Sequence, residues 1–405
     1  MAHIAWLGKK SPFCGNVTYG LSITEALRRR GHGVSFIHFD TPPAGLGRHE
    51  PVATEVRSLK SGANLTPGNP EVALSYLVKS QVYTIPSPGA QRELRESLER
   101  LKPDLVHASL TLSPLDFRLP DLCQQLGLPL VATFHPAFDA ALRNLAGGTQ
   151  QLTYQLYAPA LARFDRVIVF SELQADLLER LGVRRERLAV IPNGVDPLQW
   201  APAGEEDPRD GVAAELAKLR QRFAGRRLFL YMGRIATEKN VEALLKAWRL
   251  VQPQGCLLVI VGDGPLRPSL QDGREDDVIW WGYEPERAVR LALLQLAEVF
   301  LLPSLVEGLS LALLEAMASG TACVATDAGA DGEVLDGGAG IVISTQGVTT
   351  QLRTLLPVLR EQPVLTAELG RRARERVLER YTLERNIEAL EALYGALLPS
   401  GRVAA

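Results

Sequence analysis

The chain has 405 residues, and its 44 Lys and Arg residues against 46 Asp and Glu residues give a formal net charge of −2. This balance excludes proteins that bind nucleic acid by neutralising phosphates over an extended surface, because these carry a basic surplus. With 46% hydrophobic and 22% charged residues, the chain is not of the disordered class, and its length predicts two or three domains.

The first half of the chain alternates short apolar runs with amphipathic stretches. Runs at residues 4–7, 34–39, 104–107, 129–134 and 166–170 predict buried strands, and a helical pattern after the first of them ends at Gly31. Strands that are apolar throughout and separated by helices are typical of a parallel sheet covered on both faces. We therefore predict a Rossmann-like domain, and we interpret the irregular residues 42–91 as an insertion without chemistry.

Turn-forming residues at 192–211 separate this half from a second one with the same alternation. Apolar runs predict strands at residues 228–232, 257–261, 278–281, 299–302, 322–325 and 341–343, and residues 347–398 have a helical pattern only. The fold class that we predict is α/β, with two Rossmann-like domains facing each other across a cleft and a helical C-terminal tail. Ligands of such domains bind at the carboxyl ends of the strands.

No segment is predicted to span a membrane or to direct secretion. The most apolar long stretch, residues 299–330, is interrupted by Glu307, Glu315 and Asp327. Lys9 and Lys10 follow the first apolar run, whereas the basic residues of a signal peptide precede it. The four cysteines are far apart and form no C-x-x-C pair, which fits reduced thiols in a cytoplasmic protein.

Two carboxylates eight positions apart follow the predicted strand at residues 299–302. Gly308 permits a tight turn after Glu307, and Ser310 is a suitable cap for a helix that starts near Leu311. The free amides at the start of that helix would form a site for a diphosphate. Glu315, about one turn further along, would accept hydrogen bonds from the hydroxyls of a ribose diol. The alternative is a capped amphipathic helix whose two glutamates face solvent.

Two cations follow the first strand of the second half. Arg234 comes directly after Met232 and Gly233, and Lys239 follows five residues later. At the end of a strand both side chains can reach one anion, Arg234 through a forked contact and Lys239 as a point charge. The alternative is a pair of surface cations on a loop.

Taken together, these motifs resemble those of the family 4 glycosyltransferases, which have the GT-B fold. The resemblance covers nearly the whole chain in order and includes Gly31-His32, Ile191 to Asp196, Gly233-Arg234 with Lys239, Val261 to Pro265, Pro303 to Gly320, and Gly329 with Glu333. It implies an acceptor domain at residues 1–195, a nucleotide-sugar donor domain at 196–382, and a C-terminal helix at 383–405 that crosses back to the first domain.

The resemblance also implies roles for individual residues. Arg234 and Lys239 match the cations that bind the donor pyrophosphate, His135 matches the active-site histidine, and Gly15 matches a glycine-rich loop near the phosphates. Asn16 and Asn240 depart from the family pattern, since glycine is usual at both positions. The implied donor-binding set comprises Gly15, Arg234, Lys239, Glu307, Gly308, Leu309, Ser310, Leu311 and Glu315, and the implied catalytic set comprises His135, Glu307, Arg234 and Lys239.

The activity implied is transfer of a hexose, with retention of the anomeric configuration, from UDP-galactose or UDP-glucose to an acceptor hydroxyl. No Asp-x-Asp motif occurs in the chain, so we expect neither a metal nor another cofactor. The alternatives are a GT-B nucleotide-sugar epimerase, which would need further acid–base carboxylates, and a non-catalytic sugar-nucleotide binding protein.

The acceptor is suggested by one segment only. Residues 4–19 are similar to the start of bacterial-type digalactosyldiacylglycerol synthases, which implies a galactolipid acceptor; a soluble sugar or polysaccharide is the alternative. A lipid acceptor implies peripheral membrane contact through the first domain. The residues proposed for that contact are Arg28, Arg29, Arg30 and Lys79, with apolar Val72, Leu74, Tyr76 and Leu77 beside them. The alternative, which we favour, is that they form a solvated helix end and part of a core.

Overall fold

The computed structural model describes residues 1–11, 14–40, 70–80, 83–137, 145–204, 211–223, 225–271 and 275–398. Residues 12 and 13 of the segment similar to galactolipid synthases, and residues 42–69, 81 and 82 of the predicted insertion, lie outside this description. The chain forms two compact units. The first comprises Met1–His135, Thr153–Ile191 and the segment from Ile387, and the second comprises Pro192–Asn386 with Pro136–Leu152.

The first unit contains a seven-stranded parallel sheet in the order β3-β2-β1-β6-β7-β8-β9. The first six strands of this order follow the Rossmann pattern 3-2-1-4-5-6. All residues of β6 and β7 are buried, which fits the uninterrupted apolar runs of the sequence. The strands are β1 (His3–Leu7), β2 (Gly33–Phe39), β3 (Glu71–Leu74), β6 (Leu105–Ser109), β7 (Leu130–Thr133), β8 (Arg166–Val169) and β9 (Leu188–Val190).

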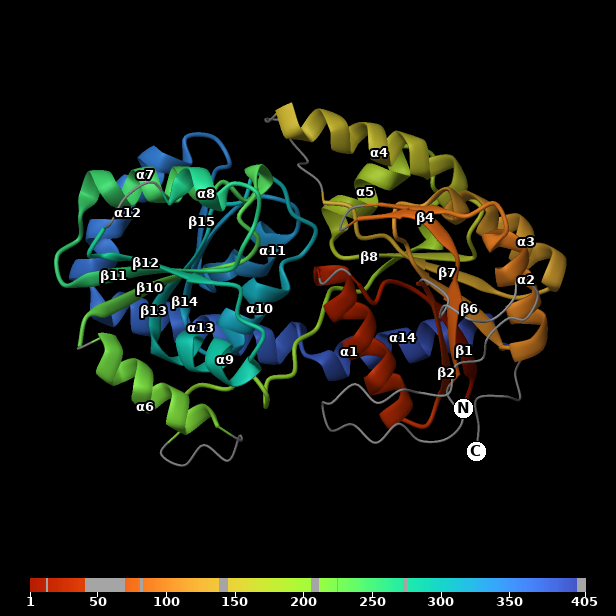
Figure 1. The fold of residues 1–405 in the computed structure, drawn as a ribbon, viewed down its shortest axis with the longest axis horizontal. Coiled ribbons are helices and arrows are strands. Elements are labelled where there is room, and N and C mark those ends of the chain that lie inside the picture. The colour runs from red at the N-terminus through yellow and green to blue at the C-terminus, as the bar shows by residue number, and fades with distance from the viewer. Residues whose placement is uncertain are drawn as a thin grey trace. The chain divides into compact units, whose positions relative to one another are not determined.

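Helices lie on either side of this sheet (Figure 1). The last one returns to the first unit from the end of the chain, where Glu391 pairs with Arg30 and His32, and the Tyr394 hydroxyl contacts Nδ1 of His107 at 2.5 Å. The helices are α1 (Gly15–Arg29), α2 (Ala90–Leu101), α3 (Leu119–Leu126) and α5 (Glu172–Arg180), with short 3-10 turns at Pro114–Arg118 and Arg185–Arg187. Two further helices have residues in both units: α4 (Leu145–Leu161) belongs to the first unit from Thr153, and α14 (Leu383–Leu397) belongs to it from Ile387.

The interpretation of residues 42–91 as an irregular insertion is wrong for its described part. β3 is an edge strand of the main sheet, and β4 (Tyr76–Lys79) pairs antiparallel with β5 (Thr84–Pro86). Val72 and Leu74 are buried in β3, so they are not available for lipid, whereas Leu77 is 64% exposed. Arg28 is half-buried and donates to the carbonyl of Val34 rather than lying on a free basic face.

The second unit contains a six-stranded parallel sheet in the order β12-β11-β10-β13-β14-β15, again the Rossmann order. Every residue of β11 and β14 is buried. The strands are β10 (Arg227–Met232), β11 (Cys256–Val261), β12 (Val278–Gly282), β13 (Ala297–Leu302), β14 (Ala322–Thr326) and β15 (Ile341–Ile343).

Helices cover both faces of this second sheet as well (Figure 1). The sequence prediction that residues 347–398 are helical is confirmed by the last three helices of the chain. Those of the second unit are α6 (Val212–Phe223), α7 (Val241–Val251), α8 (Arg267–Leu270), α9 (Arg287–Leu296), α10 (Leu311–Ala318), α11 (Asp331–Leu335), α12 (Val348–Glu361) and α13 (Pro363–Arg380), with 3-10 turns at Thr237–Lys239 and Asp336–Gly338.

Two glycines let the loops that follow β10 and β11 approach each other. A Cβ atom on Gly262 would lie 1.9 Å from the carbonyl oxygen of Gly233, and one on Gly264 would lie 2.2 Å from that of Ile235. Only glycine fits so close a backbone approach. The Gly262-Asp263-Gly264 motif therefore has a packing role, whatever else it does.

None of the helices in the described ranges combines the length and apolarity needed to cross a bilayer.

Candidate active site

The turn between β13 and α10 is the centre of the candidate site in the second unit. Ser310 is extended, with φ −73° and ψ 117°, and its hydroxyl accepts from the amide of Leu313 at 3.3 Å. A serine cap satisfies one of the amides that a helix start leaves unpaired. The predicted helix start at Leu311 and the predicted cap are both confirmed.

Glu307 lies in this turn and is only 7% exposed, so the alternative of a solvent-facing glutamate is wrong. Its Oε1 accepts from the hydroxyl of Ser304 at 2.8 Å and forms an ion pair with Nζ of Lys239. Both partners follow the carboxyl end of a strand, Ser304 after β13 and Lys239 after β10. Parallel strand order thus brings together three residues that are up to 68 positions apart in the sequence.

Arg234 forms an ion pair with Glu238 on the loop that follows β10. The hydroxyl of Tyr231 donates to the carbonyl oxygen of Arg234 at 2.7 Å and fixes the start of this loop. The amide of Leu305 donates to the carbonyl oxygen of Glu238 at 2.8 Å, which ties the cation loop to the turn that carries Glu307. Arg234 and Lys239 therefore flank one site, each already paired with a carboxylate.

The backbone conformation of Asn240, the residue after Lys239, explains why asparagine can replace the glycine that is usual in the family. Asn240 has φ 52° and ψ 35°, a left-handed conformation, and it immediately precedes α7. Glycine adopts this conformation most easily, and asparagine tolerates it better than other residues. Asn240 therefore preserves the backbone path of the loop.

Glu315 is buried on α10, with 8% of its surface exposed, so it does not face solvent either. Burial raises the pKa of Glu315 to about 7, and the positive charge of Arg290 opposes that rise. Around neutral pH this side chain is therefore partly protonated. A carboxyl group in that state both donates and accepts hydrogen bonds.

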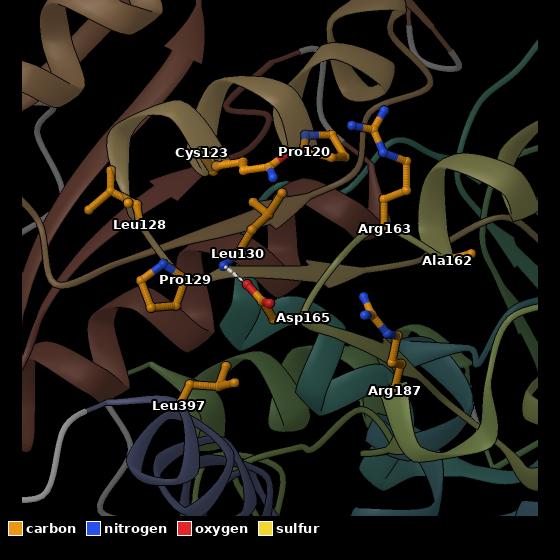
Figure 2. A pocket seen from close by; sticks show the side chains of 12 residues that line it. Pro120, Cys123, Leu128, Pro129, Leu130, Ala162, Arg163, Asp165, Arg187 and Leu397 are labelled. Carbon is orange, nitrogen blue, oxygen red and sulfur yellow. Dashed lines mark hydrogen bonds between the residues drawn. The ribbon is translucent and has the colours of Figure 1, made fainter.

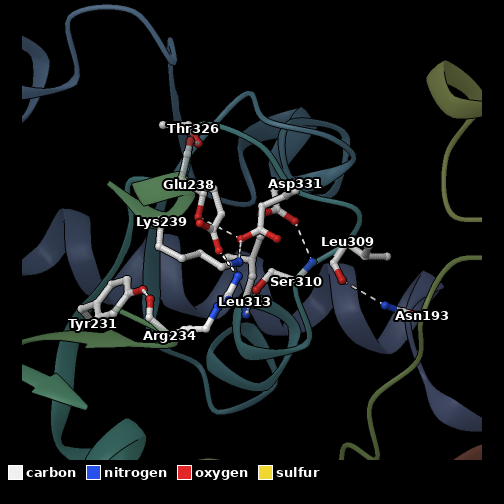
Figure 3. Close-up of polar contacts among 12 residues, drawn as sticks. Asn193, Tyr231, Arg234, Glu238, Lys239, Leu309, Ser310, Leu313, Thr326 and Asp331 are labelled. Carbon is white, nitrogen blue, oxygen red and sulfur yellow. Dashed lines mark hydrogen bonds and ion pairs between the residues drawn. The ribbon is translucent and has the colours of Figure 1, made fainter. Parts of the chain in front are cut away.

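Asp331 is a residue of this site that the sequence prediction missed. Its Oδ1 accepts from the amide of Ser310 at 2.9 Å, so the Ser310 amide that was predicted for the donor already has a partner (Figure 3). Its loop packs directly on the Glu307 turn, because a Cβ on Gly329 would lie 2.1 Å from the carbonyl oxygen of Glu307. Burial, and after it the charge of Glu307, raise the pKa of Asp331 well above its usual range.

Asn193 belongs to the Ile191–Asp196 motif of the family resemblance and was given no role there, yet it contacts this turn. The Asn193 side-chain amide donates to the carbonyl oxygen of Leu309 at 2.9 Å (Figure 3). The next residue must be glycine, since a Cβ on Gly194 would lie 2.6 Å from the carbonyl oxygen of Thr382. The Asn-Gly pair thus combines a polar contact to the site with a close backbone crossing.

In the first unit, His135 lies just beyond the carboxyl end of β7. Its Nε2 is 2.8 Å from the hydroxyl of Ser109, and the same hydroxyl donates to Oδ1 of Asn16 at 2.8 Å. The Asn16 side-chain NH₂ donates to the carbonyl oxygen of Leu110 at 3.1 Å, which fixes the orientation of the amide. Asn16 and Ser109 were not among the predicted site residues. They are 93 positions apart in the sequence, and no local pattern indicates a contact over that separation.

The surroundings of His135 keep its ring neutral. It is half-buried against the rings of Tyr19 and Phe170, whose centroids lie 5.0 and 5.3 Å away. Burial lowers the pKa of His135 to about 3, and the positive charge of Lys9 adds to this. Lys9 itself is buried after β1, a position at which a charged residue could have been recognised in the sequence as part of a site.

Gly15 begins α1, and a Cβ there would meet no atom of the described residues within 4 Å. Packing therefore does not require glycine at this position. Because glycine has no side chain, there is open space beside the start of this 15-residue helix.

A cavity of about 570 Å³ lies elsewhere in the first unit (Figure 2). Its walls include Leu130 at the start of β7, Asp165 just before β8, and Arg187 just before β9. These are amino ends of strands, whereas His135 and Lys9 follow carboxyl ends. Because open parallel sheets bind ligands at the carboxyl ends, this cavity is distinct from the candidate site.

Among the described residues, no group of three or more His, Cys, Asp or Glu side chains is arranged to hold a metal ion.

Comparison with known proteins agrees with this architecture. A model described as Glycosyltransferase Family 4 matches residues 15–198, and one described as Glycosyl transferases group 1 matches residues 226–357. The chain belongs to this glycosyltransferase family. Its two Rossmann-type sheets, and the family motifs found in both of them, place the chain in the GT-B class.

Two relatives illustrate the range of the family. The chain is 31% identical to the alpha-D-kanosaminyltransferase of Streptomyces kanamyceticus over 281 residues, which cover 66% of this chain and 71% of that protein. It is 30% identical to the alpha-maltose-1-phosphate synthase of Mycolicibacterium smegmatis over 278 residues, covering 63% and 70%.

Solved structures share the fold over nearly the whole chain. HepE of Anabaena, solved in complex with UDP and glucose, superposes with a TM-score of 0.74 at 17% identity, covering 98% of this chain and 100% of that one. Sucrose-phosphate synthase of Thermosynechococcus elongatus gives 0.73 at 20% identity, covering 98% and 99%. The protein is a nucleotide-sugar glycosyltransferase of the GT-B fold, as predicted from the sequence.

Proposed function

We propose that the protein transfers a hexose from UDP-glucose or UDP-galactose to an acceptor hydroxyl, with retention of the anomeric configuration. The observation that carries the proposal is the convergence of Lys239 and Ser304 on Oε1 of Glu307, beside the start of α10. The complex of HepE with UDP and glucose supports the choice of donor.

The cations would hold the donor diphosphate. The ammonium group of Lys239 has three donors, of which the pair with Glu307 uses one. The guanidinium group of Arg234 has five donors in a planar fork, a geometry that suits the oxygens of a phosphate. Open space at Gly15 and the first amides of α10 are further places for phosphate oxygens.

Glu307 would hold the hexose. Lys239 and Ser304 both contact Oε1, so the lone pairs of Oε2 are left to accept from sugar hydroxyls. Gly308, Leu309 and Leu311 would contribute backbone amides, and Glu315 would bind the ribose diol. Neutral His135 would orient the donor sugar.

In the reaction, the bond between the anomeric carbon and the diphosphate oxygen breaks, and a bond from that carbon to the acceptor oxygen forms on the same face. The acceptor proton passes to the departing phosphate oxygen. Arg234, Lys239 and the start of α10 would stabilise the charge that develops on the leaving group, which is where electrostatic catalysis has its largest effect. We propose that no divalent metal is needed for this step, and a complete loss of turnover in chelator would contradict that.

The test is Glu307→Gln assayed with a panel of nucleotide sugars and sugar acceptors. Transfer is expected to fall roughly 10²–10³-fold, because the neutral amide cannot form an ion pair with Lys239 and keeps only one of the two acceptor oxygens. Glu298→Gln is the matched control, since Glu298 pairs with Arg227 at the opposite end of the same sheet. Equal turnover in the two variants would exclude the role given to Glu307, and conversion of donor alone to an epimer would favour the isomerase alternative.

A glycolipid acceptor is the second candidate, and one surface feature favours it. Strands β4 and β5 follow the carboxyl end of β3 and expose Leu77, Val78 and Ile85, with Lys79 on the same strand as the first two. Exposed apolar residues beside a cation suit the interface of an anionic membrane.

Sedimentation with liposomes that contain anionic lipid and galactolipid tests this second candidate. The wild-type protein should sediment with them and glycosylate the galactolipid, and Leu77→Ser with Val78→Ser should reduce both. Leu198→Ser is the control, because Leu198 is 79% exposed but belongs to the second unit. A wild-type protein that stays in the supernatant and uses only soluble sugars would exclude the membrane acceptor.

A further inference from the structure

One carboxyl group in the second unit has a polar atom that none of the roles above employs. Asp331 is only 1% exposed, and its Oδ1 accepts from the amide of Ser310. Its other oxygen, Oδ2, is buried and has no hydrogen-bond partner among the described residues. Buried polar atoms without partners are costly and uncommon in folded proteins, so each one calls for an explanation.

The place of Asp331 relates this atom to the donor site. The amide of Ala330 donates to the carbonyl oxygen of Gly308 at 2.8 Å, and Gly329 packs against the carbonyl oxygen of Glu307. The loop that carries Asp331 is therefore fastened to the turn that carries Glu307 (Figure 3). Glu307 and Lys239 are the charged groups that act on Asp331.

The chemistry of the pair defines what Oδ2 can bind. Because Asp331 is buried next to the carboxylate of Glu307, it favours the protonated form, in which Oδ1 accepts from Ser310 and Oδ2 carries the proton. Oδ2 is then a donor that can also accept, whereas Oε2 of Glu307 is an acceptor only. Neighbouring hydroxyls of a hexose offer this combination, since each hydroxyl both donates and accepts.

We propose that Asp331 is a further donor-site residue, whose Oδ2 binds a ring hydroxyl of the transferred hexose and helps the enzyme to distinguish one hexose epimer from another. This inference rests on the proposed function of the same site. It assigns Asp331 to the sugar rather than to the diphosphate, for which Arg234 and Lys239 supply the positive charge.

Two substitutions separate this role from a structural one. Asp331→Asn keeps an oxygen for the Ser310 amide and an NH₂ donor in place of Oδ2, whereas Asp331→Leu keeps neither. The control is Asp327→Leu, because Asp327 also accepts from a backbone amide of the second unit, that of Thr345 at 3.0 Å. The assay measures kcat/KM for UDP-glucose, UDP-galactose and their 3-deoxy, 4-deoxy and 6-deoxy analogues, and calorimetry measures the Kd of UDP.

The wild-type enzyme should lose about tenfold in kcat/KM with the deoxy donor that lacks the bound hydroxyl. Asp331→Leu should show a similar loss with the natural donor, no further loss with that deoxy donor, and an unchanged Kd for UDP. Asp331→Asn should restore most of the activity, and Asp327→Leu should keep the wild-type preference between glucose and galactose.

The opposing results are distinct. This inference is wrong, while the proposed function stands, if Asp331→Leu shows the wild-type loss in kcat/KM with every deoxy donor. It is also wrong if the variant binds UDP and UDP-hexose more weakly by the same factor. If the wild-type enzyme neither binds nor uses any UDP-hexose, the proposed donor is wrong, and this inference is overturned with it.

Discussion

The two units share one strand order but differ at the carboxyl ends of their strands. In the second unit that edge carries charged groups in pairs, Lys239 with Glu307 and Arg234 with Glu238. In the first unit it carries a neutral chain of hydrogen bonds from Asn16 through Ser109 to His135. The same topology therefore presents two different chemistries.

The difference bears on the proposed roles, in which the second unit holds the diphosphate through Arg234 and Lys239 and the hexose through Glu307, while His135 of the first unit orients the sugar. A diphosphate carries charge before the reaction and more on the leaving group during it, so a charged edge with redundant donors suits it. An uncharged sugar requires direction rather than charge, and neutral groups with fixed hydrogen bonds provide that. Fold class alone would not have separated these roles, because it is the same in both units.

The largest effect is expected when a charge is removed from the second unit. Lys239→Ala should lower kcat/KM roughly 10²–10³-fold, because it removes a cation from the leaving group and leaves Glu307 without its partner. Steady-state kinetics measure this, with the donor that the panel of nucleotide sugars shows to be used. Lys218→Ala is the matched control, since Lys218 pairs with Glu215 on the surface of α6, and equal activities of the two variants would contradict the comparison.

The two units should also respond to pH in opposite directions. Glu315 has a raised pKa of about 7 against 4.5 for an ordinary glutamate, so the folded state holds its proton more tightly. Its contribution to stability is lost as pH rises from 4.5 through 7. Glu315→Gln should therefore be more stable than the wild type by about 3 kcal/mol at pH 8 and nearly equal to it at pH 4, as measured by urea unfolding.

His107 in the first unit gives the opposite sign. Burial lowers its pKa from 6.5 to about 3, so its contribution is present above pH 6.5 and is lost as pH falls towards 3. In the same experiment, His107→Gln should lose less stability than the wild type between pH 6.5 and 4. Parallel pH profiles for the two variants would show that the units do not differ in this respect.

The smallest effect concerns the neutral hydrogen bonds of the first unit. Because the Ser109 hydroxyl donates to Asn16, it accepts from His135, which places the proton on Nε2 and leaves Nδ1 as an acceptor. Asn16→Ala would let Ser109 donate to His135 and reverse the tautomer. We expect about a tenfold loss in kcat with little change in the donor KM, and a shift in the ¹⁵N resonances of His135.

Asn16→Asp keeps the acceptor oxygen for Ser109 but loses the NH₂ group that donates to Leu110, so it is expected to restore the ¹⁵N resonances and kcat in part. A loss confined to stability, with unchanged ¹⁵N resonances, would show that Asn16 serves packing only.

Local patterns predicted most of the fold and one end of the site. Uninterrupted apolar runs such as residues 257–261 give strands because a parallel sheet is buried on both faces, and Ser310 caps a helix through a contact only three residues away. Strand β3 was not predicted because it lies in the segment interpreted as an insertion, and β9, which directly precedes the turn-forming residues at 192–211, was not predicted either.

The polar contacts of the site depend on tertiary structure that no local pattern contains. Asp331 reaches Ser310 across 21 positions, and Asn193 reaches Leu309 across 116. The family resemblance directed attention to Glu307 and Lys239 but did not indicate that Asp331 occupies the Ser310 amide. The predicted basic lipid face was wrong in part, because Val72 and Leu74 are buried in a strand whose burial the sequence did not reveal.

The contact between His107 and Tyr394 joins residues that are 287 positions apart, and it has a consequence for how the chain is made. During synthesis the strands of the first unit leave the ribosome early, and domains generally fold in that order. The contacts of His107 with Tyr394, and of Arg30 and His32 with Glu391, nevertheless form only when the last helix has been translated. The unit that is synthesised first is therefore the last to be completed, because the segment from Ile387 belongs to it.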